Sequence, residues 1–215
     1  MKDGFIAVAA ATPTVVVADC ETNATAIIAA VNDAAGRGAK VIALPELCVT
    51  GYTCSDLFWQ KKLLDDAYCA LERITHETKY LDALIFVGLP LRAHGKLYNV
   101  AAACAHGRVI GFVPKQNLPA YNEFYETRHF TPGEGDMGTV VFAGEEVPFG
   151  QNLLFACESL PDLVVAAEIC EDLWVPAPPS TQHALAGATL VCNLSASDEM
   201  VGKSDYRRSL VAGQS

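Results

Sequence analysis

The sequence has 215 residues, of which 51% are hydrophobic and 19% are charged, so it can bury a sizeable core and is not a disordered segment. Fifteen basic and twenty-five acidic residues give a formal net charge of -10, which argues against nucleic acid or an anionic membrane surface as a partner. The apolar stretch at residues 5–11 is shorter than a signal peptide or a membrane span requires. We therefore expect one cytoplasmic domain over residues 1–215.

The first part of the chain alternates strand-like and helical segments. Residues 5–11 form a short apolar run that is typical of a buried strand. Apolar residues then recur at helical spacing between a cap at Asp19 and a stop signal at Gly36. A second buried strand is predicted for residues 41–44, and an amphipathic helix is predicted for residues from about 56 to 80.

The remainder of the chain is richer in strands. Strands are predicted at residues 84–89, 97–104, 108–113, 139–142, 152–157, 163–169 and 189–194, with a hairpin joining the second and third of them. A short helix is expected around residues 181–186, and another helix opens at residue 205. The loop from Pro114 to about Gly138 is long enough to suggest a functional role. Helices alternating with strands and hairpins favour two sheets packed face to face, with helices outside.

Familiar ligand-binding motifs are out of place or missing from the sequence. Residues 133–138 match a dinucleotide-binding pattern, but no strand precedes them and no helix follows, so we interpret them as a turn. The sequence contains no serine nucleophile elbow, phosphate loop or His-Glu-x-x-His motif. Its eight cysteines form no Cys-x-x-Cys pair, so no zinc or redox site is predicted and most thiols should be buried hydrophobes.

Three reactive side chains, Glu46, Lys115 and Cys170, come directly or one proline after the end of a predicted strand. Side chains beyond the carboxyl ends of strands share a crevice in open α/β folds, so we expect these three to meet. A thiol needs a base and a nearby cation, which makes Glu46 the proton acceptor and Lys115 the group that favours the thiolate. Lys115 and the backbone N–H of Glu171 would hold the oxyanion. Taken singly, each would more often be a loop charge or a core cysteine, but together they predict amide cleavage through a thioester.

The motifs around these residues resemble those of the nitrilase superfamily, whose members use a Glu-Lys-Cys triad. The resemblance is carried by Leu-Pro-Glu-Leu at 44–47, Pro-Lys-Gln-Asn-Leu-Pro at 114–119, and Ala-Glu-Ile-Cys-Glu-Asp-Leu-Trp at 167–174. It implies a four-layer α-β-β-α sandwich that covers nearly the whole chain. Domains of this family continue beyond the helix near residue 205 with further strands, so we expect this chain to be truncated at its C-terminus.

A narrower resemblance is to the glutamine-hydrolysing (glutaminase) domain of glutamine-dependent NAD synthetases. It is carried by Tyr121, by Cys-Glu-Asp-Leu-Trp at 170–174 and by Asn-Leu-Ser-Ala-Ser at 193–197. It implies hydrolysis of the side-chain amide of L-glutamine to glutamate and ammonia, with Glu126 as a second glutamate that positions the lysine. The implied substrate pocket is lined by Tyr52, Tyr121, Phe124, Glu171, Ser197 and Lys203.

The pocket assignment has some chemical support, because glutamine carries an α-ammonium and an α-carboxylate that call for an acid and a base. Glu171 and Lys203 are the right residue types, although either could equally be a solvated surface charge. Tyr52 and Phe124 could equally be core or lid aromatics.

The synthetase half of such enzymes has a Ser-Gly-Gly-x-Asp-Ser loop, which this sequence lacks. We therefore expect no cofactor or metal in this domain, with ATP and magnesium belonging to an absent synthetase domain. There the ammonia would amidate nicotinic acid adenine dinucleotide. Expected partners are L-glutamine, that synthetase domain and further copies of this chain in a homo-oligomer. Two alternatives stay open: a nitrilase-type hydrolase of another amide, nitrile or carbamoyl compound, and a truncated, non-catalytic partner module.

Overall fold

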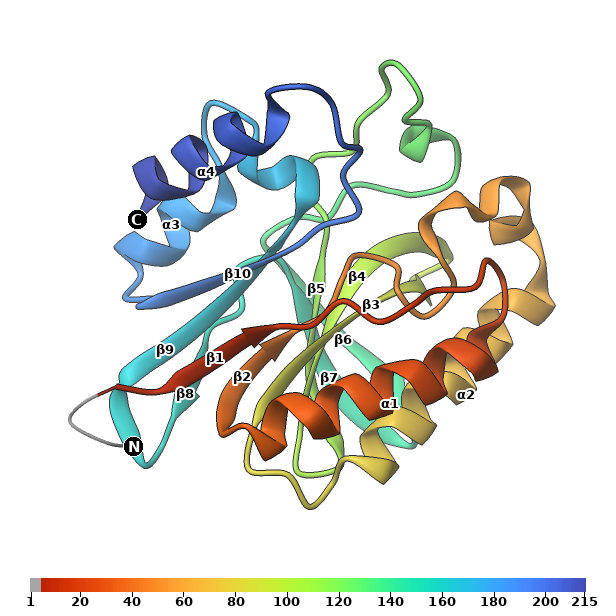
Figure 1. The fold of residues 1–215 in the computed structure, drawn as a ribbon. Helices are drawn as coiled ribbons and strands as arrows, with labels where there is room; N and C mark the ends of the chain where they lie inside the picture. Colours follow the sequence, from red (N-terminus) through yellow and green to blue (C-terminus); the bar gives the residue numbers. More distant parts are fainter. Residues whose placement is uncertain (1–4) are drawn as a thin grey trace.

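Two β-sheets pack face to face between helices in the computed structural model of this chain (Figure 1), which describes residues 5–215. Residues 1–4 of the predicted domain lie outside the described residues. The larger sheet has seven strands in the order β1-β2-β3-β4-β5-β7-β6, and the smaller sheet has three in the order β10-β9-β8. The predicted four-layer α-β-β-α sandwich is confirmed.

The elements have the following bounds. The larger sheet contains β1 (Ala7–Ala10), β2 (Ala39–Ala43), β3 (Leu84–Ala93), β4 (Lys96–Ala105), β5 (Arg108–Pro114), β6 (Asp136–Phe142) and β7 (Glu145–Gly150). The smaller sheet contains β8 (Phe155–Cys157), β9 (Leu160–Ile169) and β10 (Leu190–Leu194). The α-helices are α1 (Cys20–Gly36), α2 (Lys61–Glu77), α3 (Pro179–Leu185) and α4 (Lys203–Gln214), and the 3-10 helices are η1 (Tyr52–Trp59), η2 (Glu126–Arg128) and η3 (Cys170–Leu173).

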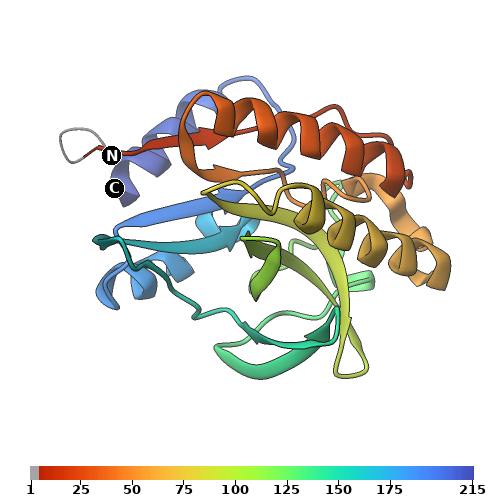
Figure 2. The same ribbon diagram turned by 90° about the horizontal axis from the view of Figure 1, so that it is seen from below.

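Helices α1 and α2 lie side by side across the outer face of the larger sheet (Figure 2). Each helix turns one apolar stripe inward, with Ile27 and Val31 of α1 and Leu71 and Ile74 of α2 fully buried. The predicted cap of α1 forms, because the Asp19 carboxylate accepts a hydrogen bond from the backbone N–H of Thr22 at 3.0 Å. The amphipathic pattern therefore determines which helix faces build the outer layer.

The two sheets meet through a second apolar cluster. Strands β2 to β5 supply Val41, Phe86, Ala101, Ala103 and Val113, and strands β9 and β10 supply Val165, Ala167, Ile169, Cys192 and Leu194. Helix α3 packs on the far side of β9, and α4 lies on that same side of the molecule in Figure 1. No residue of α4 is buried. Among the described residues, every helix is too short or too polar to cross a lipid bilayer.

Strand direction brings the loops after β2 and β5 to one edge of the sandwich. Strands β2 and β3 are parallel, while β4 is antiparallel to both β3 and β5. Strand β5 therefore runs in the same direction as β2, and the loops that follow these two strands leave from the same edge of the larger sheet. The smaller sheet pairs β9 and β10 in parallel, and β9 contacts β4 and β5 across the interface between the sheets.

Several predicted elements differ from the structure. Strand β1 was expected to be buried, but it forms the edge of the larger sheet and Val8 is 55% exposed. The helix predicted from about residue 56 is divided, since the 3-10 helix η1 comes first and α2 begins at Lys61. Strand β3 continues through Pro90 and forms a hairpin with β4 that was not predicted. Strand β7, with its sequence Glu-Glu-Val-Pro-Phe-Gly, was also missed, because proline and paired glutamates weaken a strand pattern.

Candidate active site

Glu46 lies in a tight turn after β2 and is only 2% exposed. The next residue, Leu47, has a left-handed φ of 51°, which bends the chain sharply. The turn packs directly on Gly88 of β3, where an added Cβ would lie 2.4 Å from the Pro45 carbonyl oxygen and 2.8 Å from the Glu46 Cα. Only glycine at position 88 leaves room for the Glu46 turn at its observed distance from the sheet.

Gly88→Ala is therefore expected to destabilise the fold by at least about 1–3 kcal/mol, because the new methyl group collides with backbone that cannot move aside cheaply. The unfolding free energy measured in urea tests this expectation. Gly36→Ala is a matched control at the end of α1, where an added Cβ meets nothing within 4 Å. A Gly88→Ala variant as stable as the Gly36→Ala variant would contradict the close-packed turn.

Lys115 follows β5 and has no exposed surface. Its Nζ lies 2.6 Å from Glu46 Oε1 and 2.5 Å from Glu126 Oε1, so one ammonium group pairs with two buried carboxylates. Glu126 begins η2 within the long loop after β5, and the Tyr52 hydroxyl donates to its Oε1 at 2.8 Å. The structure thus brings together three of the predicted catalytic residues and one of the predicted pocket residues.

Burial and charge act in opposite directions within this cluster. Burial acts to lower the pKa of Lys115, but the carboxylates of Glu46 and Glu126 outweigh it and hold that pKa above its usual value. Burial, together with the charge of Glu46, raises the pKa of Glu126, while Lys115 opposes the rise. Lys115 is therefore a permanent cation at neutral pH, and it holds two carboxylates that would otherwise repel each other.

Cys170 is the first residue after β9 and is 6% exposed. Its φ of 46° lies in the left-handed region, which costs a non-glycine residue energy and persists only where the surrounding structure holds it. The Ser195 hydroxyl donates a hydrogen bond to Cys170 Sγ at 3.3 Å. Among the eight cysteines, only Cys170 has a left-handed φ.

The thiol of Cys170 is protonated at rest. Burial and the charge of Glu46 raise its pKa to about 12, while Lys115 and the Ser195 hydrogen bond act in the opposite direction. Lys115 was expected to favour a thiolate, but in the structure burial of the thiol outweighs the attraction of Lys115. The proton must therefore leave Cys170 as the sulfur attacks, which calls for a base at hand.

Glu46 is held from the smaller sheet as well as from the larger one. The backbone N–H of Ala196, in the loop after β10, donates to Glu46 Oε2 at 3.1 Å. Ser195, which bonds the thiol, is the neighbouring residue. The loop after β10 therefore contacts both the carboxylate and the sulfur, and brings them to the same place.

Four of the predicted pocket residues form a continuous row beside this cluster. The Phe124 ring contacts Tyr52 and Tyr121, with centroids 6.2 Å and 5.7 Å apart in edge-on geometry. The Tyr121 hydroxyl donates to Glu171 Oε2 at 2.8 Å. Burial raises the pKa of Tyr121 to about 12, and the hydrogen bond to Glu171 acts in the same direction. Tyr121 thus remains a donor that orients the Glu171 carboxylate.

The other two predicted pocket residues lie in the segment after β10. Lys203 forms an ion pair with Asp198, and its Nζ lies 5.3 Å from the centroid of the Trp174 ring. Ser197 is half-buried in the same loop. Within residues 5–215, neither forms a hydrogen bond or ion pair with Glu171 or with the Glu46–Lys115 cluster.

Asn99, in the middle of β4, was not predicted as a site residue. Its Nδ2 donates to Glu46 Oε1 at 2.7 Å, and its backbone carbonyl accepts from the Lys115 N–H at 2.8 Å. Asn99 is 1% exposed, so it supports the buried carboxylate from the floor of the site. No local pattern marks such a residue, because its role depends on the register between β4 and its neighbours.

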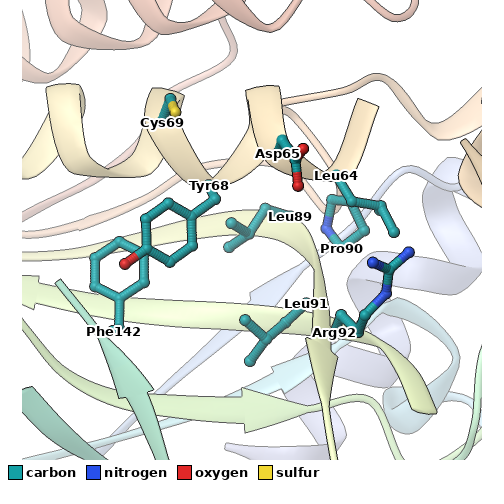
Figure 3. A pocket seen from close by; sticks show the side chains of 9 residues that line it. All are labelled: Leu64, Asp65, Tyr68, Cys69, Leu89, Pro90, Leu91, Arg92 and Phe142. Carbon is teal, nitrogen blue, oxygen red and sulfur yellow. The ribbon is translucent and has the colours of Figure 1, made fainter. Parts of the chain in front are cut away.

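Two hollows help to place the site. A pocket of about 380 Å³ lies between α2 and β3 (Figure 3), and none of the residues that line it is a predicted site residue. A second pocket, of about 220 Å³, is lined by Tyr52 and Glu126 together with Tyr125, His129 and neighbouring residues. This second pocket reaches the edge of the candidate site. The described residues contain no group of three or more side chains suited to holding a metal ion.

The sandwich has the fold of a carbon-nitrogen hydrolase, and the chain belongs to that family, whose sequence pattern matches residues 5–212. It is 42% identical over 214 residues to the glutamine-dependent NAD(+) synthetase of Mycobacterium tuberculosis, a match that covers 100% of this chain and 32% of the relative. The human glutamine-dependent NAD(+) synthetase is 28% identical over 203 residues, which cover 90% of this chain and 28% of the human protein.

Solved structures agree with this relationship. A glutamine-dependent NAD(+) synthetase from Cytophaga hutchinsonii superposes with a TM-score of 0.84 at 34% identity, covering 95% of this chain and 33% of that one. An amidase from Nesterenkonia sp. shares the fold, with a TM-score of 0.74 at 20% identity, and covers 100% of this chain and 73% of that one. The resemblance drawn from the motifs is confirmed. The chain spans about a third of the length of the synthetases it matches.

Proposed function

We propose that this chain is the glutaminase part of a glutamine-dependent NAD synthetase, and that Glu46, Lys115 and Cys170 hydrolyse the side-chain amide of L-glutamine. The observation that carries the proposal is the contact of Lys115 Nζ with both Glu46 and Glu126, 2.6 Å and 2.5 Å away, in a buried cluster beside Cys170. The choice of glutamine as substrate is supported by the glutamine-dependent synthetases that match the whole chain.

In the first half of the proposed reaction, Glu46 accepts the thiol proton as Cys170 Sγ attacks the carbonyl carbon of the glutamine amide. The carbonyl oxygen becomes an oxyanion, stabilised by the Lys115 ammonium and by the backbone N–H of Glu171. Glu46 then returns its proton to the amide nitrogen. The C–N bond breaks, ammonia leaves and a thioester remains on Cys170.

In the second half, Glu46 removes a proton from a water molecule, and the resulting hydroxide attacks the thioester. The C–S bond breaks, Cys170 regains its proton and glutamate is released. Glu126 does not exchange protons in this scheme. Its role is to hold Lys115, with Tyr52 fixing its carboxylate through a 2.8 Å hydrogen bond, so that the ammonium group keeps its place while charge develops on the substrate.

The substrate pocket follows from the row of aromatic residues. Tyr52, Phe124 and Tyr121 lead from the catalytic cluster to Glu171, whose carboxylate is oriented to receive the α-ammonium of glutamine. For Lys203 to bind the α-carboxylate it must exchange its contact with Asp198 for the substrate. Ser197 is assigned to the same end of the pocket.

The proposal extends to partners outside these residues. A synthetase domain, which would use ATP and magnesium, would consume the ammonia to amidate nicotinic acid adenine dinucleotide, while residues 1–215 would form the hydrolase domain and hold no cofactor themselves. Association into a homo-oligomer and a cytoplasmic location stay predictions.

The test is ammonia release from L-glutamine, compared with release from L-asparagine and from simple aliphatic amides. We expect turnover of glutamine, and selective labelling of Cys170 among the eight cysteines by a glutamine-like electrophile followed by mass spectrometry. If another amide, a nitrile or a carbamoyl compound were turned over faster than glutamine, that compound and not glutamine would be the substrate. A Cys170 no more reactive than buried Cys104 would instead point to a non-catalytic module.

A further inference from the structure

Asp172 is a fully buried carboxylate two residues after the candidate nucleophile, on η3. Its Oδ1 accepts hydrogen bonds from the backbone N–H of Asn117 at 2.8 Å and from Asn117 Nδ2 at 2.9 Å. The backbone N–H of Gln116 approaches the same oxygen at 3.2 Å. Its Oδ2 accepts from the backbone N–H of Ile169 at 3.0 Å. One side chain therefore joins two segments that are more than fifty residues apart in the sequence.

The residues that Asp172 holds are the direct neighbours of the catalytic pair. Gln116 immediately follows Lys115, and Ile169 immediately precedes Cys170. We propose that Asp172 is a positioning residue that fixes the turn carrying Lys115 against the turn carrying Cys170, an inference that rests on the proposed amide hydrolysis. It touches neither the thiol nor the ammonium group within hydrogen-bonding distance, so it acts through the backbone of both turns.

Both turns need such a restraint. Cys170 has a φ of 46°, and a strained residue keeps its conformation only where the surroundings over-determine it. Lys115 stands at the start of the long loop that extends to β6, where a displacement of the first residues would move the ammonium group. A carboxylate that accepts several N–H bonds is a stronger restraint than neutral hydrogen bonds would be.

The charge state of Asp172 is consistent with this role. Burial raises the pKa of Asp172 to about 6, while the N–H groups of Ile169 and Asn117 and the side chain of Asn117 act in the opposite direction. The carboxylate is therefore largely ionised at neutral pH. The four hydrogen-bond donors that converge on it would lose their shared acceptor if the charge were removed.

Glu168 offers a matched comparison on the same strand end. It is 2% exposed and accepts hydrogen bonds from the backbone N–H of Ser180 at 3.1 Å and from Asn193 Nδ2 at 3.2 Å. These bonds tie β9 to α3 and β10, away from the loop that carries Lys115. Glu168 and Asp172 are thus both buried carboxylates that bond backbone N–H groups, but only Asp172 reaches the lysine turn.

The experiment compares Asp172→Asn with Glu168→Gln. In Asp172→Asn, the new amide nitrogen must face either the Ile169 N–H or the Asn117 donors, so one side of the restraint is lost in either orientation. We expect kcat for glutamine hydrolysis to fall about tenfold or more, as small displacements of catalytic groups produce, with KM changed less than about twofold. Alkylation of Cys170 by iodoacetamide should slow by a similar factor. Glu168→Gln should leave kcat, KM and the alkylation rate nearly unchanged while lowering the thermal midpoint.

Each result is decisive. If Asp172→Asn and Glu168→Gln lose stability equally and react equally fast with iodoacetamide, the positioning role is overturned and Asp172 is a structural cap only. If Asp172→Asn does not fold, the Asn117→Ala variant tests the positioning role instead, because it removes only the side-chain bond to Asp172. The proposal then requires that Asn117→Ala slows the alkylation of Cys170 with little change in KM. If the unsubstituted chain shows neither glutamine turnover nor selective alkylation of Cys170, the proposed function itself fails.

Discussion

Replacing Glu46 with glutamine is expected to remove glutamine turnover while leaving the chain folded. Glutamine has the same shape as glutamate, and its carbonyl oxygen can still accept the hydrogen bond from Lys115 Nζ, which lies 2.6 Å from Oε1. Its amide nitrogen loses only the bond that the Ala196 N–H donates to Oε2 at 3.1 Å. The glutamine amide cannot accept the thiol proton or return it to the leaving amide nitrogen. Loss of a general acid and base lowers rates by about 10²–10⁴-fold, so kcat should fall by at least that factor.

The same substitution should make Cys170 easier to ionise. The carboxylate of Glu46 is one of the groups that raise the pKa of Cys170, and Lys115 opposes it. With a neutral glutamine in its place, the repulsion disappears and the ammonium group is less neutralised, so the pKa of Cys170 must fall. The pH profile of Cys170 alkylation should therefore move to lower pH in Glu46→Gln, even though turnover is lost.

Alkylation by iodoacetamide between pH 6 and pH 10 or so, followed by mass spectrometry, measures this shift. Cys170→Ala is the control, because it should show neither turnover nor the shifted alkylation while the other seven thiols react unchanged. An alkylation profile of Glu46→Gln that stays in place, or moves to higher pH, would show that Glu46 does not act on the thiol. If the Glu46→Gln variant still turned over glutamine at a substantial rate, Glu46 would be excluded as the base.

Lys115→Met is the second substitution with a large expected effect, and it acts on stability as well as activity. Methionine fills a similar volume but leaves the buried carboxylates of Glu46 and Glu126 without their cation. Removing one partner of a buried ion pair costs about 3–5 kcal/mol, and here the two carboxylates would also face each other. We expect a fall of that size in the free energy of unfolding, together with loss of turnover.

The loss of unfolding free energy in Lys115→Met should be larger at high pH than at low pH. The pKa of Glu126 is already raised by burial and by Glu46, while Lys115 opposes the rise, so removing Lys115 raises it further. When the pKa of a carboxyl group is higher in the folded state than in the unfolded state, the fold loses stability as the pH rises from the unfolded-state pKa to the folded-state pKa. Above the folded-state pKa the loss is complete. Lys115→Met should therefore lose most stability at neutral and higher pH, and recover part of it as the solution is acidified.

Lys40→Met is the matched control for this measurement. Lys40 Nζ lies 2.5 Å from Asp82 Oδ2, but the two side chains are 43% and 83% exposed, and such surface pairs contribute only about 0–1 kcal/mol. Urea unfolding at pH 5 and pH 8 compares the two variants. A Lys115→Met variant that loses no more stability than Lys40→Met would show that the Lys115 cluster is not the tightly coupled, buried unit described above.

The parts of the fold that follow local patterns could be predicted from the sequence. Helix α1 begins after its Asp19 cap and ends at Gly36, as its apolar spacing indicated. The hairpin of β4 and β5 was also predicted. Strand β1 was wrongly expected to be buried, because an apolar run says nothing about whether the strand lies at the centre or at the edge of its sheet.

The sequence by itself determined the residue types of the candidate site and their places in the chain. Glu46, Lys115 and Cys170 each follow an apolar strand, and the pattern around them named the family. Only the tertiary structure decided their environment. Burial makes Cys170 a protonated thiol and Lys115 a fully paired cation, and the packing of β4 against its neighbours supplies Asn99. Hydrogen bonds from segments far apart in the sequence, such as those that meet at Asp172, exist only after the chain has folded, because no local pattern encodes which backbone groups will converge.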